Sequence, residues 1–161
     1  MNLEITQCTS VHIPQLVELW KEYLVDQGDD PILQHIDINH IDGYGNILNS
    51  FLKNEPEGFI AALIDEEVVG FVIAKKDAYG PNYRTLENIG NIQIIHTKRG
   101  YRHKGIASKL LVKAIEYLQS NECTIILSET DQQNEASLSL LEKYGFRKRG
   151  NLVALIHREE S

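Results

Sequence analysis

The part of the sequence best suited to chemistry is a hydrophobic stretch that leads into a basic turn and then into a helix beginning with small residues. It covers residues 92–107, with the sequence IQIIHTKRGYRHKGIA. The first amides of a helix lack partners within the helix, and with the helix dipole they form a binding site for an anion. Gly105 and Ala107 let a phosphate approach the backbone, and Arg102 and Lys104 add positive charge. The segment contains neither a Walker loop nor a dinucleotide fingerprint.

The distribution of charge favours a compact anionic ligand over a long polyanion. The chain has a formal net charge of -7, but residues 1–80 are strongly acidic whereas residues 81–161 carry an excess of basic residues. Residues 88–115 contain no acidic residue; their basic residues are Lys98, Arg99, Arg102, Lys104, Lys109 and Lys113. A confined basic stretch in an acidic protein suits a small anion, and a solvated loop and helix face is the structural alternative. Nucleic-acid binding is disfavoured, because the rest of the chain would repel phosphate and only Tyr101 offers a nearby aromatic ring.

Length and composition indicate a single domain covering residues 1–161. Hydrophobic residues make up 42% of the chain and charged residues 24%, which is typical of a folded globular protein. No apolar run reaches about 18 residues and the first residues, MNLEITQCTS, do not resemble a secretory signal, so we expect a cytoplasmic protein with no membrane partner. Cys8 and Cys123 have neither the spacing of metal ligands nor the number needed for a disulfide framework, and no metal is expected.

The periodicity of hydrophobic residues predicts the elements that position the basic turn. Helices are expected at residues 11–25, 46–53, 105–120 and 135–144. Strands are expected at residues 3–7, 58–64, 68–75, 87–97, 124–130 and 152–157. We expect Ser10 to cap the first helix, residues 26–45 to form an irregular acidic connection, and Gly145 to follow the last helix. This order is typical of an α/β or α+β domain with a mixed sheet.

Three segments of the chain resemble the GNAT superfamily of N-acetyltransferases. The sequence RHKGIA at residues 102–107 resembles the acyl-CoA signature (Q/R)-x-x-G-x-(G/A) of that family. Residues 134–146 resemble its second signature, which ends in Gly-Phe, and residues 67–73 are similar to the strands that precede the CoA site. The resemblance covers nearly the whole chain in the family's order. It implies a single-domain GNAT-type fold with a mixed, mostly antiparallel sheet of roughly six or seven strands and about four flanking helices.

The resemblance also implies that acetyl-CoA is the cosubstrate and where it binds. In the family, the backbone of the turn and of the first helical residues holds the pyrophosphate, which here assigns Arg102, His103, Lys104, Gly105, Ile106, Ala107 and Ser108. The strand end is expected to separate from strand 124–130, so that the pantetheine arm pairs with the backbone edge of Ile95, His96 and Thr97. Asn134 would contact the pantetheine or cap the helix that follows it.

The residues that would transfer protons depart from the family pattern. The tyrosine usual in the second signature is Leu141 here, and the strand positions where the family often has a Glu or His base are Asn91 and Gln93. Neither amide takes up a proton at neutral pH, although both can hold a water molecule. Tyr144 and Glu129 are the available substitutes, with core packing and a solvated carboxylate as their respective structural alternatives. The four candidate catalytic residues are Asn91, Gln93, Glu129 and Tyr144.

The acidic connection corresponds to the family's loop that shapes the acceptor pocket. Asp26, Asp29 and Asp30 lie there and favour a cationic acceptor. Such an acceptor would be a polyamine, an aminoglycoside-like sugar amine, or a Lys or N-terminal amine of a peptide.

The sequence therefore predicts an acetyl-CoA-dependent N-acetyltransferase in which a primary amine attacks the thioester directly. The alternative is a catalytically weak acyl-CoA-binding sensor with the same fold, because the usual proton-transfer residues are replaced. Dimers are frequent in the family, so a homodimer is expected, with residues 147–158 as the edge strand that pairs.

Overall fold

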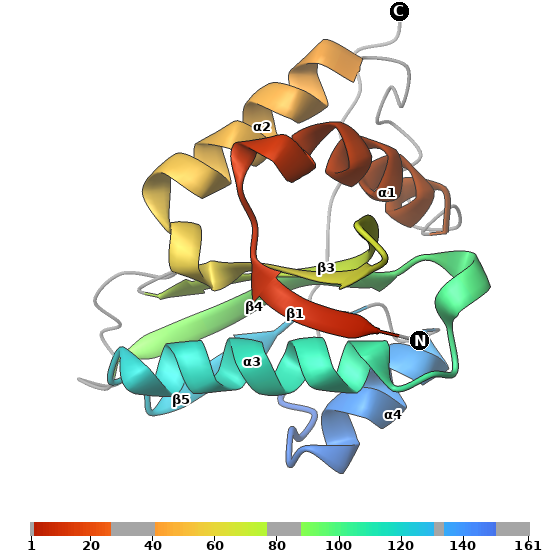
Figure 1. The fold of residues 1–161 in the computed structure, drawn as a ribbon. Helices are drawn as coiled ribbons and strands as arrows, with labels where there is room; N and C mark the ends of the chain where they lie inside the picture. The colour runs from red at the N-terminus through yellow and green to blue at the C-terminus, as the bar shows by residue number, and fades with distance from the viewer. Residues whose placement is uncertain (1, 27–40, 77–87, 131–133, 151–161) are drawn as a thin grey trace, which may run out of the picture.

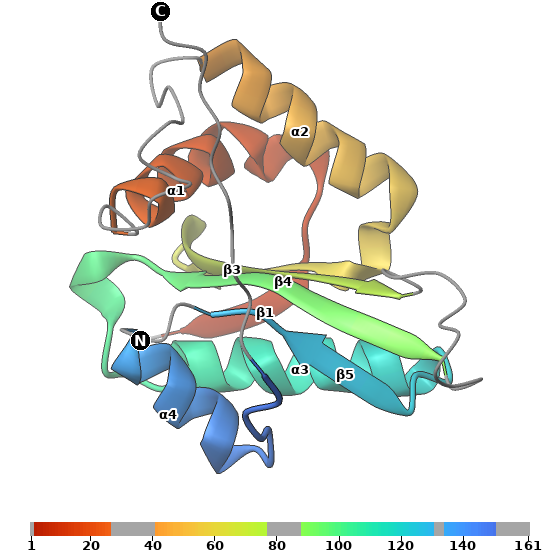
Figure 2. The same ribbon diagram turned by 180° about the vertical axis from the view of Figure 1, so that it is seen from behind.

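A computed structural model describes residues 2–26, 41–76, 88–130 and 134–150. One five-stranded sheet with the order β1-β2-β3-β4-β5 lies between two layers of helices (Figure 1). Helices α1 and α2 cover one face, and α3 and α4 cover the other (Figure 2). The strands are β1 (Leu3–Gln7), β2 (Phe59–Ile64), β3 (Glu67–Lys76), β4 (Ile89–Thr97) and β5 (Ile125–Ser128). The helices are α1 (Ile13–Asp26), α2 (Ile41–Asn54), α3 (Ile106–Ser120) and α4 (Glu135–Lys143).

The sheet is mixed and mostly antiparallel, as the resemblance implies, but the described residues form five strands rather than the six or seven expected. Strands β1 to β4 pair antiparallel in sequence order, and β5 joins β4 in parallel. The register between β3 and β4 shifts by one residue, because Ile73 pairs with Ile94 whereas Ala74 pairs with Ile92. Gln93 is therefore the extra residue of a β-bulge in β4.

The sheet is buried on both faces, which explains the uninterrupted hydrophobic run of β2. Alternate residues of that strand enter two separate cores. The core under α3 includes Ile60, Ala62, Ile92, Leu110 and Leu118. The core under α1 and α2 includes Leu16, Leu48, Phe59, Phe71 and Ile73. Cys8 and Cys123 are both buried, and within the described residues neither forms a disulfide.

Two expectations about the first helices are wrong. Thr9, not Ser10, is the N-cap, and a 3-10 turn at Ser10–His12 precedes α1. The His12 ring accounts for the N-cap at Thr9, because its Nδ1 atom accepts a hydrogen bond from the Thr9 amide at 3.0 Å. Helix α2 begins at Ile41, so it includes residues that the sequence assigns to the irregular connection.

The early start of α2 shows tertiary packing outweighing local propensity. Gly43 and Gly45 are poor helix formers, so the sequence pattern does not predict that the first turns of α2 are helical. Burial of Tyr44 and Leu48 on one face of the helix compensates for them. The remaining bounds agree with the expected ones to within two residues, while the strand expected at residues 152–157 lies outside the described residues. None of the helices in the described ranges is long and apolar enough to cross a membrane.

Candidate functional site

Strands β4 and β5 separate halfway along β4, as the sequence predicts. Their pairing ends where Ile92 meets Ser128, and the Ser128 hydroxyl donates to the Ile92 carbonyl oxygen at 3.1 Å. Beyond this point and the bulge at Gln93, residues 94–97 remain paired with β3 on one side only. Within the described ranges, their backbone edge toward β5 has no strand partner, so an extended ligand can pair with it.

Two polar side chains on this half of β4 are left without a partner. Gln93 Oε1 and Thr97 Oγ1 are buried and have no hydrogen-bond partner among the residues that the structure describes. Buried polar atoms are nearly always paired in folded proteins, so unpaired ones require an explanation. A ligand that carries amide groups along the free edge would supply the missing partners.

The turn after β4 has the backbone conformation of an anion site. His103 and Gly105 both have positive φ, of 63° and 77°, on either side of Lys104. Gly105 is the N-cap of α3 and provides no side-chain cap, and the first helical bond runs from the Lys109 amide to the Gly105 carbonyl oxygen at 3.2 Å. The amides of residues 106–108 are therefore left for a ligand. We call residues 102–108 the phosphate turn.

Most of the positive charge around the phosphate turn is already paired. Lys98 forms an ion pair with Glu67; Arg99 and Arg102 pair with Asp26; Lys113 pairs with Glu116. Lys104 lies 5.3 Å from the centre of the Tyr101 ring. In the described part of the chain, Lys104 and Lys109 have no ion pair, so Lys104 and the backbone amides are the groups most available to a phosphate.

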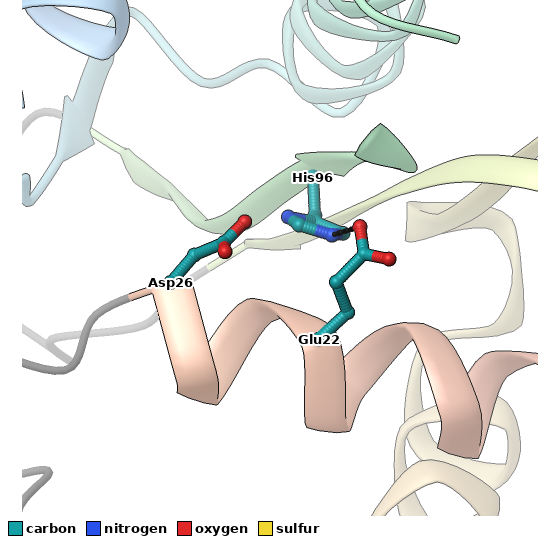
Figure 3. Close-up of side chains that lie close together, drawn as sticks. All are labelled: Glu22, Asp26 and His96. Atoms are coloured by element: carbon teal, nitrogen blue, oxygen red, sulfur yellow. Dashed lines mark hydrogen bonds and ion pairs between the residues drawn. The ribbon is translucent and has the colours of Figure 1, made fainter. Parts of the chain in front are cut away.

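Glu22 and Asp26 connect the end of α1 to this region (Figure 3). Glu22 Oε1 interacts with the His96 Nε2 atom at 3.0 Å and accepts from the Arg99 amide at 3.0 Å. Asp26 Oδ1 accepts from Arg99 Nε at 3.1 Å, and its other oxygen pairs with the Arg102 guanidinium. Partial burial raises the pKa of the Asp26 carboxyl, but the hydrogen bonds from Arg99 and Arg102 outweigh it, so the pKa lies below its ordinary value.

His96 is held inside the α1 layer rather than exposed to a ligand. Its side chain is 5% exposed, and its ring lies 5.8 Å from that of Tyr23 and 6.2 Å from that of Phe71. Burial lowers the pKa of His96 more than the hydrogen bond to Glu22 raises it, so the ring is neutral at pH 7 and Nε2 carries the donated hydrogen. His96 is thus available to a ligand only through its backbone.

The same three side chains have the spacing of a metal site but not its electrostatics. Ligand-type atoms of Glu22, Asp26 and His96 lie within 4.8 Å of one another. Asp26 is already bonded to two guanidinium groups, and a cation would have to displace them. The cluster is an ion-pair network.

Three of the four candidate catalytic residues lie at or near the point where the strands separate. Asn91 is buried on β4 beside Leu127, Gln93 forms the bulge, and Glu129 is exposed directly after β5. Tyr144 lies apart from them, at the C-cap of α4, where it packs against the α3-side core. Leu141 is buried in that same core.

The remaining candidates are placed as follows. Asn134 caps α4, its side chain accepting from the Ser137 amide at 3.1 Å, which confirms the capping role; contact with pantetheine stays a prediction. Asp26 faces two arginines of its own chain, so its charge is not free for an acceptor. Asp29 and Asp30 lie outside the described residues.

Sequence reasoning missed Glu22 and Glu67 as parts of this site. Glu67 accepts from the Tyr101 hydroxyl at 2.8 Å and pairs with Lys98, and these two contacts lower the pKa of its carboxyl, the Lys98 hydrogen bond first. A signal for Glu22 existed. Acidic residues at the C-terminal end of a helix oppose the helix dipole, so Glu22 and Asp26 at the end of α1 indicated basic partners elsewhere in the fold.

Comparisons with known proteins agree with this geometry. Residues 13–146 match the model of the acetyltransferase (GNAT) family. N-alpha-acetyltransferase 30 of Xenopus laevis is 32% identical over 96 residues, which cover 60% of this chain and 34% of that protein. The match therefore spans about a third of the length of this curated relative.

Solved structures are similar in fold over nearly the whole chain. Aminoglycoside N-acetyltransferase AAC(6')-Iy in complex with CoA has a TM-score of 0.76 at 17% identity, covering 98% of this chain and 95% of that one. A protein from Clostridium acetobutylicum, described as a predicted acetyltransferase and solved with acetyl-CoA, also has a TM-score of 0.76. It is 20% identical and covers 96% of both chains.

Proposed function

The chain belongs to the GNAT acetyltransferase family, and on this premise we propose that it transfers the acetyl group of acetyl-CoA to an amine. One observation carries the proposal: the free edge of β4 leads, through the short 3-10 turn Arg99–Tyr101, into the phosphate turn. A ligand with an extended amide-bearing arm and a phosphate at one end fits both features at once. Acetyl-CoA has that shape, and it supplies an activated acetyl thioester.

Separate parts of the chain would hold separate parts of acetyl-CoA. The backbone edge at Ile95, His96 and Thr97 would pair with the pantetheine amides, for which the unpaired Gln93 and Thr97 side-chain atoms offer further partners. The amides of residues 106–108 and the Lys104 ammonium would bind the pyrophosphate. A Cβ atom added to Gly105 would project into open space, which leaves room for that group.

The chain contributes to the reaction mainly by positioning. The amine nitrogen forms a bond to the acetyl carbon, the carbon–sulfur bond breaks, the amine loses a proton and the thiolate gains one. A backbone amide on the free edge of β4 would polarise the thioester carbonyl. Asn91 and Gln93 would orient water, and Glu129, which directly follows β5, would accept the amine proton.

We propose the N-terminal α-amine of a peptide as the first acceptor to test. The support is that the curated relatives at 31–32% identity are named N-alpha-acetyltransferases, whereas the likeness to aminoglycoside enzymes concerns the fold alone. The single domain over residues 1–161, the cytoplasmic location, the homodimer and the cationic pocket at Asp29 and Asp30 remain predictions.

The first experiment is a calorimetric titration of acetyl-CoA into the wild-type protein and into Gly105→Glu. The new carboxylate would stand beside the free amides of the phosphate turn, so binding should be lost. Gly100→Glu is the matched control, because Gly100 is exposed, has open space around it and lies just before the turn. Equal binding by wild type and Gly105→Glu would contradict the placement of the site.

Turnover then decides between the two functions that the sequence left open. Release of free CoA thiol is measured with a peptide panel, with polyamines and with an aminoglycoside. The second candidate function is the catalytically weak acyl-CoA-binding sensor. It is favoured by Asn91, Gln93 and Leu141, which stand where the family often has residues that transfer protons. Tight acetyl-CoA binding without thiol release with any amine would support it over the enzyme.

A further inference from the structure

The last turn of α1 carries two acidic residues where the helix dipole disfavours them. Glu22 and Asp26 are four residues apart and therefore lie on the same face of the helix. Their side chains are 21% and 20% exposed, and Figure 3 shows both on the side of α1 that faces His96. Both also contact the segment between β4 and α3, at Arg99 and Arg102. Two carboxylates at the negative end of the helix dipole are electrostatically unfavourable, and the contacts with residues of the segment between β4 and α3 offset this effect.

The contacts fix the segment at its backbone as well as its side chains. Glu22 accepts from the backbone amide of Arg99, which begins the 3-10 turn Arg99–Tyr101. Asp26 joins the guanidinium groups of Arg99 and Arg102, which would otherwise repel each other. Arg102 Nε in turn donates to the Thr97 carbonyl oxygen at 3.1 Å, so the last residue of β4 is tied to the start of the phosphate turn.

The segment held in this way is one that needs support. His103 follows Arg102 directly and has a left-handed backbone conformation, which is unfavourable for a residue with a side chain. Such conformations persist where the surrounding structure determines them. On the opposite side of the segment, Glu67 holds Lys98 and Tyr101. Asp26 pairs with Arg102, the residue directly before His103, so the acids of α1 support the segment at that point.

We propose that Glu22 and Asp26 are positioning residues that hold the phosphate turn in the conformation that binds acetyl-CoA. The proposal rests on the proposed function, because it assigns these residues a role in that same site. The carboxylates do not touch the phosphates. They act through Arg99 and Arg102, so the affinity for acetyl-CoA depends on a helix in the other layer of the fold.

The test compares Asp26→Asn with Asp26→Glu in calorimetric titrations of acetyl-CoA and in steady-state kinetics. Asp26→Asn should weaken acetyl-CoA binding about tenfold, because one carboxylate serves two partly exposed ion pairs. The KM for acetyl-CoA should rise by the same factor, while kcat and the KM for the acceptor stay unchanged. Asp26→Glu, which keeps the charge, should recover most of the affinity. Glu18→Gln is the control, because Glu18 lies on the same helix and, among the described residues, pairs only with Lys21.

Arg99→Gln removes the other partner of the Asp26–Arg99 ion pair. The Arg99 side chain is 57% exposed, so we expect this variant to fold. If Asp26 acts through the arginines, Asp26→Asn and Arg99→Gln combined should bind no more weakly than the weaker single variant. Strict additivity would overturn the proposal, as would unchanged or tighter binding by Asp26→Asn. A wild-type protein that binds no acetyl-CoA would instead overturn the proposed function, and the inference with it.

Discussion

His96 connects a strand of the site to the helix above it through a single buried ring. The ring packs between Tyr23 and Phe71, and its Nε2 atom bonds to Glu22. Glu22, Asp26 and Arg102 are the charged groups that face it. Because burial lowers the pKa of His96, the neutral form is favoured in the folded protein and the charged form is not.

The free energy of unfolding should therefore decrease as the pH falls below about 6.5, the ordinary pKa of histidine. Between the lowered folded pKa of His96 and this value, the unfolded chain binds more protons than the folded one, so acid favours unfolding. The lowered pKa of Asp26 means that its own stabilising contribution is lost only at more acidic pH. Urea unfolding at about pH 7.5 and about pH 5.5 measures the change. The drop should be smaller in His96→Gln; an equal drop would assign it to another group.

Gly105 is the second residue whose conformation matters directly. Its φ of 77° is unfavourable for any residue with a Cβ atom, although no atom lies within 4 Å of the position that a Cβ would occupy. Gly105→Ala should therefore lower the free energy of unfolding by about 1 kcal/mol through backbone strain alone. Gly100→Ala, at a neighbouring glycine without a positive φ, should change it by much less. Urea unfolding of both variants measures the two changes in the free energy of unfolding. Equal changes would contradict backbone strain at position 105.

At the scale of elements, hydrophobic pattern predicts the strands and helices but not their register. The run FIAALI of β2 and the periodicity of α3 follow from burial that is local to each element. The bulge at Gln93 depends on how β4 pairs with β3, which no single segment specifies. The contacts of Glu22 and Asp26 join residues more than 70 positions apart. The sequence predicts the basic turn itself, but it does not predict which acidic residues pair with that turn.

The turn between α2 and β2 shows an equally non-local constraint. A Cβ atom at Gly58 would lie 2.1 Å from the Ala74 carbonyl oxygen and 2.8 Å from a ring carbon of Tyr117. Glu55 holds the Tyr117 ring and the end of β3, because it accepts from the Tyr117 hydroxyl at 2.9 Å and from the Lys76 amide, two residues after Ala74, at 3.0 Å. The backbone therefore has little freedom to withdraw.

Gly58→Ala should lower the free energy of unfolding by about 2 kcal/mol or more, as overpacking does in well-ordered cores. Gly43→Ala in α2 is the matched control, because its Cβ would meet no atom within 4 Å and alanine favours a helix. It should raise the free energy by roughly 0.5 kcal/mol or more. Chemical denaturation of the two variants gives both values, and a tolerated Gly58→Ala would show that the turn can shift.

At the scale of the whole molecule, the two helical layers contribute different parts of one site. The α3 layer provides the free helix amides, and the α1 layer provides the acidic side chains that hold the preceding turn. The acidic first half and basic second half of the sequence are thus brought together in the fold and largely neutralise each other where they meet. The sequence pattern indicates a site for an anionic ligand in the basic stretch, but several of its basic side chains form ion pairs with acidic residues of the first half of the chain.

The early separation of β4 from β5 also bears on solubility. An unpaired strand edge at the border of a sheet invites edge-to-edge association between molecules and, ultimately, fibrils. Among the described residues, the unpaired edge of β4 opens between two strands that are joined at one end, so β5 flanks the position that a further strand would take. An opening of this kind disfavours the docking of a second sheet more than that of a single extended chain.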